Sequence, residues 1–439
     1  MKCVKNIILI SVLLLNSILC RAQQFYFPPL STGDWEMTSP ASLGWCEEKT
    51  DTLYSFLESN NTKAFMVLKD GKIVLEKYFG TFKPDSIWYW ASAGKTLTAT
   101  LAGIAVEEGF LSLDLPVSDY LGAGWSTCPP EKEILIHVRN QITMTSGLND
   151  AVTDPDCSSP ECLQYLADAG TRWAYHNAPY TLLEEVIPAA TGMDFNAYFN
   201  SRIRNKTGMN GLWISLGYNH IYFSSARSMA RFGLLLLAEG KWDSQPVLSD
   251  TSFFMAMVNS SQTMNRSYGY LTWLNGKASY MLPQSQFVFP GFLCPDAPED
   301  MFSAMGKNGQ IVNVVPSEGL VVIRMGNAPD NQYEIPNVFN NLIWQHLNNV
   351  ICSSSGIGEQ KSESSKFEIY PNPASTAVNI IPANSVGNYQ TLLFDVEGKL
   401  LKYSENTQKL DVSHILPGIY TLLITQNGIK THFVLSIIR

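Results

Sequence analysis

The pattern of apolar and polar residues predicts both helices and strands along the chain. Apolar residues recur at helical spacing from Ser92 to Gly109, and Gly109 is a typical helix stop. Residues 180–191 and 193–203 show helical spacing as well. Short apolar runs bounded by turn residues predict strands over 64–68, 73–75, 311–315 and 320–323. The first two runs flank a turn and predict a hairpin, and the last two predict adjacent antiparallel strands.

The start of the chain has the pattern of a targeting segment. Lys2 and Lys5 precede an apolar run over residues 7–19, and small residues follow it near Ala22. This order predicts a signal peptide over residues 1–22, removed after Ala22. No other stretch is apolar and long enough to span a membrane. The sequence therefore predicts an exported, soluble protein.

A polar stretch after Cys352 predicts a second domain. Residues 353–365 are rich in Ser, Gly and Glu and predict a flexible linker between a main domain over 23–352 and a small domain over 366–439. The small domain shows short alternating strands with turns at 395–399, 416–418 and 427–428. By pattern alone it is a β-sandwich of the immunoglobulin kind.

Composition and charge narrow the possible functions. The 439 residues carry a net charge of -9 and no basic cluster, which argues against nucleic acid as a partner. The six histidines are scattered, so neither a metal nor another cofactor is expected. The cysteines past the signal peptide are Cys46, Cys128, Cys157, Cys162, Cys294 and Cys352. The sequence does not choose among their pairings, although Cys157 and Cys162 are close enough for a disulfide within one loop.

Three short motifs follow one another along the main domain. They are Ser92-Ala93-Gly94-Lys95, Tyr175-His176-Asn177 and Lys307-Asn308-Gly309. Each motif alone is weak, since about one Ser-x-x-Lys arises by chance in a chain of this length. Ser92 is nevertheless the one serine with a lysine three positions on. Second copies of the other two patterns, at 198–200 and 69–71, fall in a predicted helix and a predicted hairpin turn.

Ser92 is the candidate nucleophile because it opens the predicted buried helix. Unpaired backbone amides at a helix start favour negative charge on a reacting oxygen. A spacing of three places Lys95 on the same helical face, one turn deeper. Burial among apolar neighbours is expected to lower the pKa of Lys95, so that its amine works as a base. The alternative is an N-cap serine followed by a surface lysine.

The other two motifs supply a proton acceptor and residues that would bind the substrate. Tyr175 lies on a predicted loop before a helical segment, and a phenol near a lysine ammonium accepts a serine proton more easily. Asn177 would bind the substrate amide or the lysine, and His176 is assigned no role. Lys307 would face the pocket and pair with a substrate carboxylate. Taken singly, Tyr175 and Asn177 also fit a buried tyrosine and a turn asparagine.

The third motif also suggests how a developing oxyanion would be held. Gly309 would allow close approach of a ligand to the backbone. The backbone amides of Ser92 and Gln310 are expected to form the oxyanion hole, in which one donor is worth about 3 to 4 kcal/mol.

The three motifs resemble those of the serine beta-lactamase and penicillin-recognising superfamily, in its class C branch with D-aminopeptidases, carboxylesterases and 6-aminohexanoate-dimer hydrolases. The resemblance covers residues 35–345 and includes segments 64–80, 111–117, 136–148 and 224–242. It implies an α/β (α+β) beta-lactamase-like fold, in which helices flank an antiparallel sheet and form a helical subdomain. Asn308 stands where that family usually has a hydroxyl residue, which argues against efficient beta-lactam hydrolysis.

The small domain resembles the C-terminal sorting domain of type IX secretion, at residues 369–375, 411–413 and 418–420. The resemblance implies the type IX machinery as a partner, passage across the outer membrane, removal of this domain, and release or attachment at the cell surface. A carbohydrate- or protein-binding sandwich is the alternative.

The sequence as a whole predicts an exported serine hydrolase that cleaves an amide or ester bond through an acyl-enzyme. Lys307 favours a small molecule or peptide that bears a carboxylate. A carboxylesterase of the same fold, a relative that binds or acylates without turnover, and a surface adhesin are the alternatives.

Overall fold

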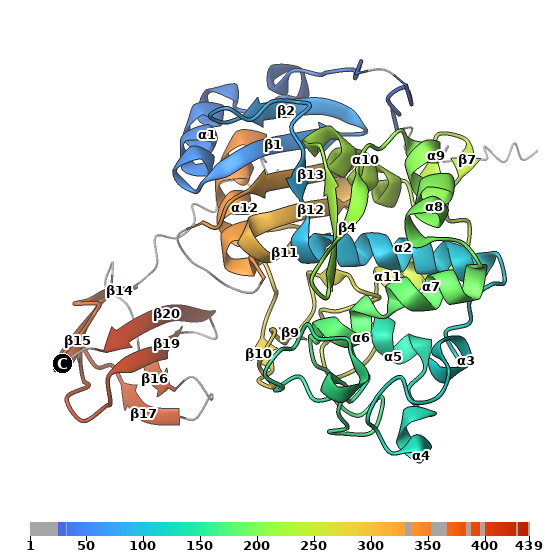
Figure 1. The fold of residues 1–439 in the computed structure, drawn as a ribbon. Coiled ribbons are helices and arrows are strands. Elements are labelled where there is room, and N and C mark those ends of the chain that lie inside the picture. Colours follow the sequence, from blue (N-terminus) through green and yellow to red (C-terminus); the bar gives the residue numbers. More distant parts are fainter. Residues whose placement is uncertain are drawn as a thin grey trace, which may run out of the picture. The chain divides into compact units, whose positions relative to one another are not determined.

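The structure is a computed structural model that describes residues 25–31, 33–329, 335–352, 367–382, 388–395, 400–426 and 429–437 (Figure 1). The expected signal peptide, the expected linker, the predicted turn at 427–428 and all but the first residue of the predicted turn at 395–399 lie outside the described residues. The chain divides into two compact units, with the boundary after Cys352.

The first unit contains both helices and strands. Its helices are α1 Thr50–Ser59, α2 Gly94–Glu107, α3 Ser118–Leu121, α4 Pro130–Glu133, α5 Val138–Ile142, α6 Asn177–Thr181, α7 Leu183–Thr191, α8 Phe195–Phe199, α9 Asn205–Thr207, α10 Ala226–Leu237, α11 Thr251–Met257 and α12 Asn337–Ile351. Its strands are β1 Thr62–Lys69, β2 Lys72–Tyr78, β3 Trp88–Tyr89, β4 Leu212–Leu216, β5 Asn219–Ser224, β6 Lys241–Trp242, β7 Gln245–Pro246, β8 Trp273–Leu274, β9 Ser279–Tyr280, β10 Phe289–Pro290, β11 Phe302–Gly306, β12 Gln310–Val315 and β13 Leu320–Gly326.

A six-stranded antiparallel sheet forms the centre of this unit. Its strand order is β2-β1-β13-β12-β11-β8. The hairpin predicted around residues 69–71 is confirmed as β1 and β2, and the paired strands predicted from 311 to 323 are confirmed as β12 and β13. The sheet therefore joins segments from both ends of the unit.

Side chains alternate between the two faces of the sheet, and helices cover both. Val312 and Val321 face α10, where Gly233 lets the helix come close: a Cβ there would lie 2.4 Å from Val321. Asn313 faces the other way and exchanges hydrogen bonds of 2.7 and 2.9 Å with Asn340 of α12. This layering is the sheet-and-helix arrangement that the sequence predicts.

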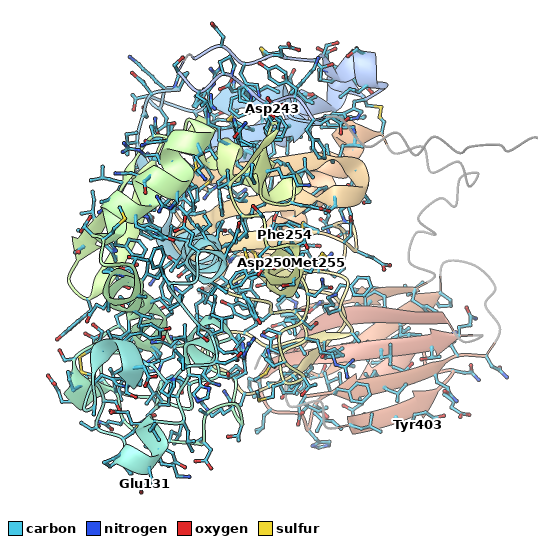
Figure 2. All side chains as sticks on the ribbon, turned by 90° about the vertical axis from the view of Figure 1, so that its right-hand side faces the viewer. Glu131, Asp243, Asp250, Phe254, Met255 and Tyr403 are labelled. Carbon is cyan, nitrogen blue, oxygen red and sulfur yellow. A yellow bond between two sulfur atoms is a disulfide. The ribbon has the colours of Figure 1, made fainter. Side chains whose placement is uncertain are left out.

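Helix α2 is buried along most of its length, as predicted, and ends just before Gly109, whose φ is +77°. Gly103 allows Phe253 of α11 to pack against it, because a Cβ at Gly103 would lie 2.6 Å from that ring. Asp250, which is labelled in Figure 2, caps α11 by accepting hydrogen bonds from the backbone N–H groups of Ser252 and Phe253. The helix that begins beside Ser92 is thus fixed along its length.

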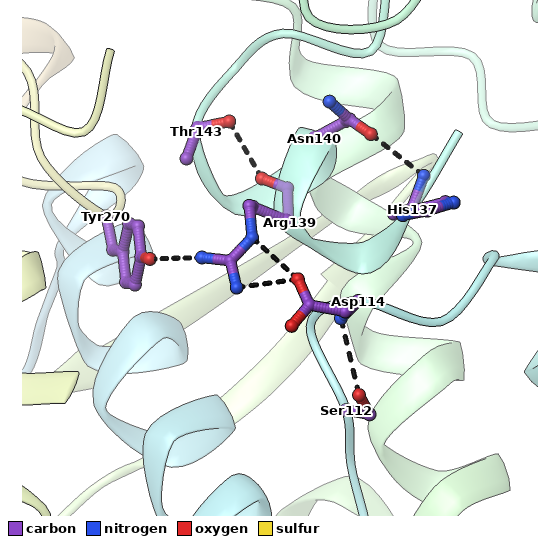
Figure 3. A network of polar contacts seen from close by, with 7 residues as sticks. All are labelled: Ser112, Asp114, His137, Arg139, Asn140, Thr143 and Tyr270. Atoms are coloured by element: carbon purple, nitrogen blue, oxygen red, sulfur yellow. Dashed lines mark hydrogen bonds and ion pairs between the residues drawn. The ribbon is translucent and has the colours of Figure 1, made fainter. Parts of the chain in front are cut away.

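Arg139 fixes the loop that follows α2 (Figure 3). Its Nε and Nη2 donate to Asp114 Oδ1 at 2.9 and 2.7 Å, and its Nη1 donates to the Tyr270 hydroxyl at 2.6 Å. Thr143 Oγ1 donates to the Arg139 carbonyl at 2.7 Å. One guanidinium thereby joins the loop after α2, helix α5 and the segment before β8.

The second unit is a small β-sandwich, as predicted. Its strands are β14 Phe367–Tyr370, β15 Ala377–Pro382, β16 Gln390–Phe394, β17 Leu400–Glu405, β18 Lys409–Asp411, β19 Gly418–Gln426 and β20 Ile429–Ile437. They form one sheet of order β14-β15-β18 and another of order β17-β16-β19-β20. Buried apolar residues of both sheets, among them Val378 and Leu422, make up its core.

Disulfides fix two places in the first unit. Cys46 pairs with Cys352 at the end of α12, and Cys157 pairs with Cys162, a pairing that their closeness in the sequence allowed without selecting it. Cys128 and Cys294 are buried free thiols in the part of the chain that the structure describes. None of the helices in that part is both long and apolar enough to cross a membrane.

Candidate active site

Ser92 lies in a sharp bend between β3 and α2. Ala91, directly before it, has a φ of +47°, a left-handed conformation that is uncommon for a residue with a side chain and that clusters at functional sites. Trp90 anchors the bend: it is fully buried, its N–H donates to the Tyr222 carbonyl, and its indole donates to Ser224 Oγ, both at 2.8 Å. The bend therefore holds Ser92 in place just before the first turn of α2.

Lys95 lies in that first turn and is only 3% exposed. Its Nζ donates to Ser92 Oγ at 2.9 Å and to Asn177 Oδ1 at 2.8 Å. The burial and these contacts do not fit the alternative of a surface lysine after an N-cap serine. The first two motifs, 80 residues apart in the chain, therefore meet at one amine.

Two tyrosine rings lie against Lys95 Nζ. The ring centroid of Tyr175 is 5.0 Å from Nζ, and that of Tyr180 is 4.2 Å away, distances at which an ammonium is attracted to the ring face. Tyr175 stacks on Trp273, with centroids 5.5 Å apart. Burial raises the pKa of Tyr180 well above its ordinary value, so this second phenol stays neutral.

The remaining residues of the second motif differ in their surroundings. Asn177 is the first residue of α6, and its Nδ2 donates to Asp156 Oδ1 at 2.7 Å. His176 is 2% exposed, and burial lowers its pKa to about 4, so its ring is neutral near pH 7. His176 is not among the residues that line the cleft, in keeping with the absence of an assigned role.

The third motif forms the turn between β11 and β12. Lys307 is exposed and lines the same cleft as Ser92. Asn308 has a φ of +64°, which asparagine tolerates better than most residues, and its Nδ2 donates to the Tyr89 hydroxyl at 2.6 Å. Asn308 does not line the cleft. Both the left-handed backbone conformation and the hydrogen bond to Tyr89 thus favour asparagine at position 308.

Gly309 and Gln310 are not among the residues that line the cleft. A Cβ at Gly309 would lie 2.5 Å from Arg324 Nη1. The Gln310 side chain exchanges hydrogen bonds of 2.7 and 3.1 Å with the backbone of Gly326. Gln310 pairs with Gly306 across the sheet, and a Cβ at Gly306 would lie 2.9 Å from the Ser92 backbone nitrogen. Gly306 therefore has the backbones of both Gln310 and Ser92 as neighbours.

One cleft of about 740 Å³ connects the three motifs. Ser92, Lys95, Tyr175, Asn177 and Lys307 all line it. Its walls also carry five charged or titratable residues outside the three motifs, namely Asp150, Asp156, Arg172, Tyr180 and His220. No short motif contains them, so nothing in the sequence marked them as neighbours of Ser92.

The cleft offers acid–base and electrostatic groups. Arg172 Nη2 and Asp150 Oδ1 form an ion pair of 2.7 Å in its wall. Over the described ranges, no three or more His, Cys, Asp or Glu side chains gather in a group that would hold a metal ion. A serine hydroxyl, a buried amine, a phenol and a lysine are together suited to nucleophilic attack on a carbonyl with proton transfer.

Comparison with known proteins agrees with this fold and these motifs. The chain belongs to the Beta-lactamase family, whose model matches residues 61–339. Residues 368–437 match the Secretion system C-terminal sorting domain, which implies the type IX machinery as a partner. The fold and the family that the sequence predicted are thereby confirmed.

Individual relatives are distant. An uncharacterized protein of Alkalihalophilus pseudofirmus is 23% identical over 60% of this chain and 82% of its own. The 6-aminohexanoate-dimer hydrolase of Paenarthrobacter ureafaciens is 20% identical over 62% of this chain and 74% of its own.

Solved structures share the fold. A provisionally assigned beta-lactamase of Bacteroides dorei has a TM-score of 0.56 at 16% identity, covering 70% of this chain and 99% of its own. The octameric penicillin-binding protein homologue of Pyrococcus abyssi has a TM-score of 0.52 at 14% identity, covering 89% and 96%. At these identities the likeness establishes the fold alone.

Proposed function

We propose that this protein is an exported serine hydrolase that cleaves an amide or ester bond through an acyl-serine intermediate. The observation that carries the proposal is the contact of Lys95 Nζ with Ser92 Oγ at 2.9 Å inside the cleft. A buried amine at that distance accepts a hydroxyl proton without any movement of the backbone. The hydrolase name of one relative agrees with this reaction class.

The proposed reaction has two halves. Ser92 Oγ attacks the substrate carbonyl while its proton passes to the pair formed by Lys95 and Tyr175. The backbone amides of Ser92 and Gln310 hold the oxyanion, and each such donor is typically worth about 3 to 4 kcal/mol. The carbon–nitrogen or carbon–oxygen bond then breaks, and the leaving group takes up the proton. Water gives a proton to the same pair and attacks the acyl carbon. The bond between that carbon and Ser92 Oγ then breaks, the acid product leaves, and the pair returns the proton to Ser92 Oγ.

Lys307 is the proposed contact for a substrate carboxylate. It is exposed on the turn between β11 and β12, and it lines the cleft that contains Ser92. Among the described residues, no carboxylate lies within ion-pair distance of its Nζ. A cation in a cleft favours an anionic substrate, so an amide or peptide that ends in a carboxylate is preferred over a neutral ester.

A second candidate function is acylation or binding without turnover. Asn308 favours this second function, because it replaces the hydroxyl residue that the family usually has at this position. Its side-chain amide donates a hydrogen bond to the Tyr89 hydroxyl at 2.6 Å. The distinction is kinetic: a turning-over enzyme releases product steadily, whereas a binding relative gives a single burst.

Export is proposed on the basis of both ends of the chain. The C-terminal unit belongs to a sorting-domain family, and residues 1–22 have the pattern of a signal peptide. We propose passage through the type IX machinery to the surface or exterior, with removal of the C-terminal unit on the way.

The first test is covalent labelling of the full chain with a fluorophosphonate, followed by intact-mass analysis. We expect a single adduct on the folded protein and none on Ser92→Ala. Ser112→Ala is a matched control, because Ser112 lies on the loop after α2, and it should label as the parent protein does. Folded parent protein that gains no adduct would overturn the proposed nucleophile.

A further inference from the structure

Asp156 lies in the wall of the cleft and bonds two side-chain amides. Its Oδ1 accepts from Asn177 Nδ2 at 2.7 Å, and its Oδ2 accepts from Asn219 Nδ2 at 2.9 Å. Each carboxylate oxygen thus has its own amide, one from the start of α6 and one from the start of β5. The three motifs do not include this carboxylate.

The partners of Asn177 fix the orientation of its amide. An ionised carboxylate only accepts hydrogen bonds, and a lysine ammonium only donates them. Asn177 lies between Asp156 and Lys95, so its Nδ2 must face the carboxylate and its Oδ1 must face the ammonium. The reversed amide would set an NH2 group against the ammonium and an oxygen against the carboxylate. The contact with Asp156 therefore ensures that the Asn177 atom facing Lys95 is the oxygen, which accepts a hydrogen bond from the ammonium.

The loop that carries Asp156 is fixed on both sides. The Asp156 N–H donates to Asp154 Oδ1 at 3.0 Å, and the Ala178 N–H of α6 donates to the Pro155 carbonyl at 3.2 Å. Cys157, the next residue, forms the disulfide with Cys162. These links hold the carboxylate at a constant place relative to the start of α6.

We propose that Asp156 is a positioning residue of the hydrolytic site. It holds the Asn177 amide with its oxygen toward Lys95, which stabilises the charged amine and keeps Nζ on Ser92 Oγ. The role of this contact in catalysis rests on the proposed serine hydrolase function. The position of the amide and its effect on Lys95 do not.

Several other groups act on the charge of Lys95. The rings of Tyr175 and Tyr180 face its Nζ, and the carboxylate of Glu184 on α7 interacts with it through space. Lys307 lines the same cleft. None of these residues bonds Asp156, so replacing Asp156 leaves them in place. A change in the Lys95 titration then reports the Asp156–Asn177 contact.

The test is a titration of Lys95 by NMR in the full chain labelled at lysine 13Cε. The Lys95 signal is identified by its loss in Lys95→Ala. Asp156→Asn should lower the Lys95 pKa by about one unit, because an amide at 156 can present either its oxygen or its NH2 group to Asn177 and so no longer fixes the acceptor that faces the charged amine. Glu161→Gln removes the same charge five residues away, at an exposed position, and should leave the Lys95 pKa unchanged. An unchanged pKa in folded Asp156→Asn would overturn the proposal.

A double-variant comparison separates positioning from direct attraction. If Asp156 acts through Asn177, the variant with both Asp156→Asn and Asn177→Ala should show the Lys95 pKa of Asn177→Ala alone. A further fall in the double variant would mean that the carboxylate acts directly on Lys95, and would overturn the positioning role. Should Asp156→Asn fail to fold, Asp156→Ser serves in both comparisons.

A second readout connects the contact to the reaction. The acid limb of the fluorophosphonate labelling rate should move to lower pH in Asp156→Asn by the same amount as the Lys95 pKa. A parent protein that does not label at any pH would refute the proposed function, and the NMR titration would still decide the role of Asp156. The Lys95 pKa could instead fall while the acid limb of the labelling-rate profile stays at the same pH. Asp156 would then affect only the unreacted site, and its role in catalysis would be overturned.

Discussion

Glu184 on α7 and His220 on β5 form a paired carboxylate and imidazole through Glu184 Oε2 and His220 Nδ1. Both side chains are nearly buried, with exposed fractions of 9% and 12%. Burial raises the pKa of Glu184 to about 7, and the hydrogen bond from His220 acts in the opposite direction. A carboxyl group that titrates near neutral pH therefore lies beside His220, which is part of the cleft wall.

The raised pKa of Glu184 makes stability depend on pH. Between about pH 4.5 and pH 7, the folded chain binds a proton that the unfolded chain releases, so stability from this group falls as pH rises through that window. Glu184→Gln removes the titration and keeps an oxygen for His220. From pH 4.5 to pH 8, the free energy of unfolding of Glu184→Gln should rise relative to that of the parent by on the order of 2 kcal/mol.

Tryptophan fluorescence during urea unfolding reports the stability of the first unit, which contains Glu184, because all ten tryptophans precede Cys352. Glu185→Gln is the matched control, since Glu185 is the exposed neighbour on the same helix. The same pH dependence in the parent and in Glu184→Gln would contradict the prediction.

Lys307→Ala should separate substrate classes. A charged hydrogen bond to a substrate carboxylate is worth about 1.5 to 3 kcal/mol, so kcat/KM should fall about tenfold to a hundredfold on an amide that ends in a carboxylate. The methyl ester of the same compound should lose little. Steady-state kinetics on this pair, with the exposed Lys241→Ala as a control, would show the difference. An equal loss on both compounds would remove the argument for a carboxylate.

Asn308→Thr restores the kind of residue that the family usually carries, yet it should destabilise this chain. A β-branched residue at a φ of +64° is strained, and the hydrogen bond to Tyr89 is lost. We expect a loss of about 1 to 3 kcal/mol in unfolding free energy. Asn308→Gly, which accepts this φ without strain, should lose less. If Asn308→Thr were more stable than Asn308→Gly, the turn would have to adopt another backbone conformation.

Removal of the Cys157–Cys162 disulfide should act on the site more than on overall stability. The double variant Cys157→Ser, Cys162→Ser frees the loop that carries Asp156, so the rate of fluorophosphonate labelling should change. The urea midpoint should shift less than in the control, because a shorter closed loop removes less chain entropy from the unfolded state. The control is Cys46→Ser with Cys352→Ser, which should lower the midpoint and leave the labelling rate of the folded protein unchanged. The opposite pattern would contradict this assignment of roles.

Local pattern was enough to predict the elements around the nucleophile. Gly109 ends α2, the turn at 69–71 joins β1 to β2, and the spacing of Ser92 and Lys95 places Nζ 2.9 Å from Oγ. These features depend on residues near one another in the chain, where periodicity and turn chemistry act directly. The family resemblance supplied the rest of the fold prediction.

The wider site was not predictable because it depends on long-range packing. Asp156 and Asn219 come together only when the loop before α6 meets the start of β5. The φ of Ala91 is equally invisible in the sequence, since alanine has no preference for a left-handed bend and Trp90 imposes it through buried contacts. The side-chain contact of Gln310 with Gly326 is another long-range contact that the sequence did not indicate, whereas the role of its backbone amide stays a prediction.

The disulfide between Cys46 and Cys352 ties the last residue of the first unit to a residue near the start of α1. Any proteolytic cut after Cys352 therefore leaves the end of α12 covalently fastened to the opposite end of its own unit. Maturation by loss of the C-terminal unit would not expose a loose helix from which fraying or exoproteolysis begins. The Cys46–Cys352 disulfide would hold the C-terminal end of the first unit in place with or without the second unit.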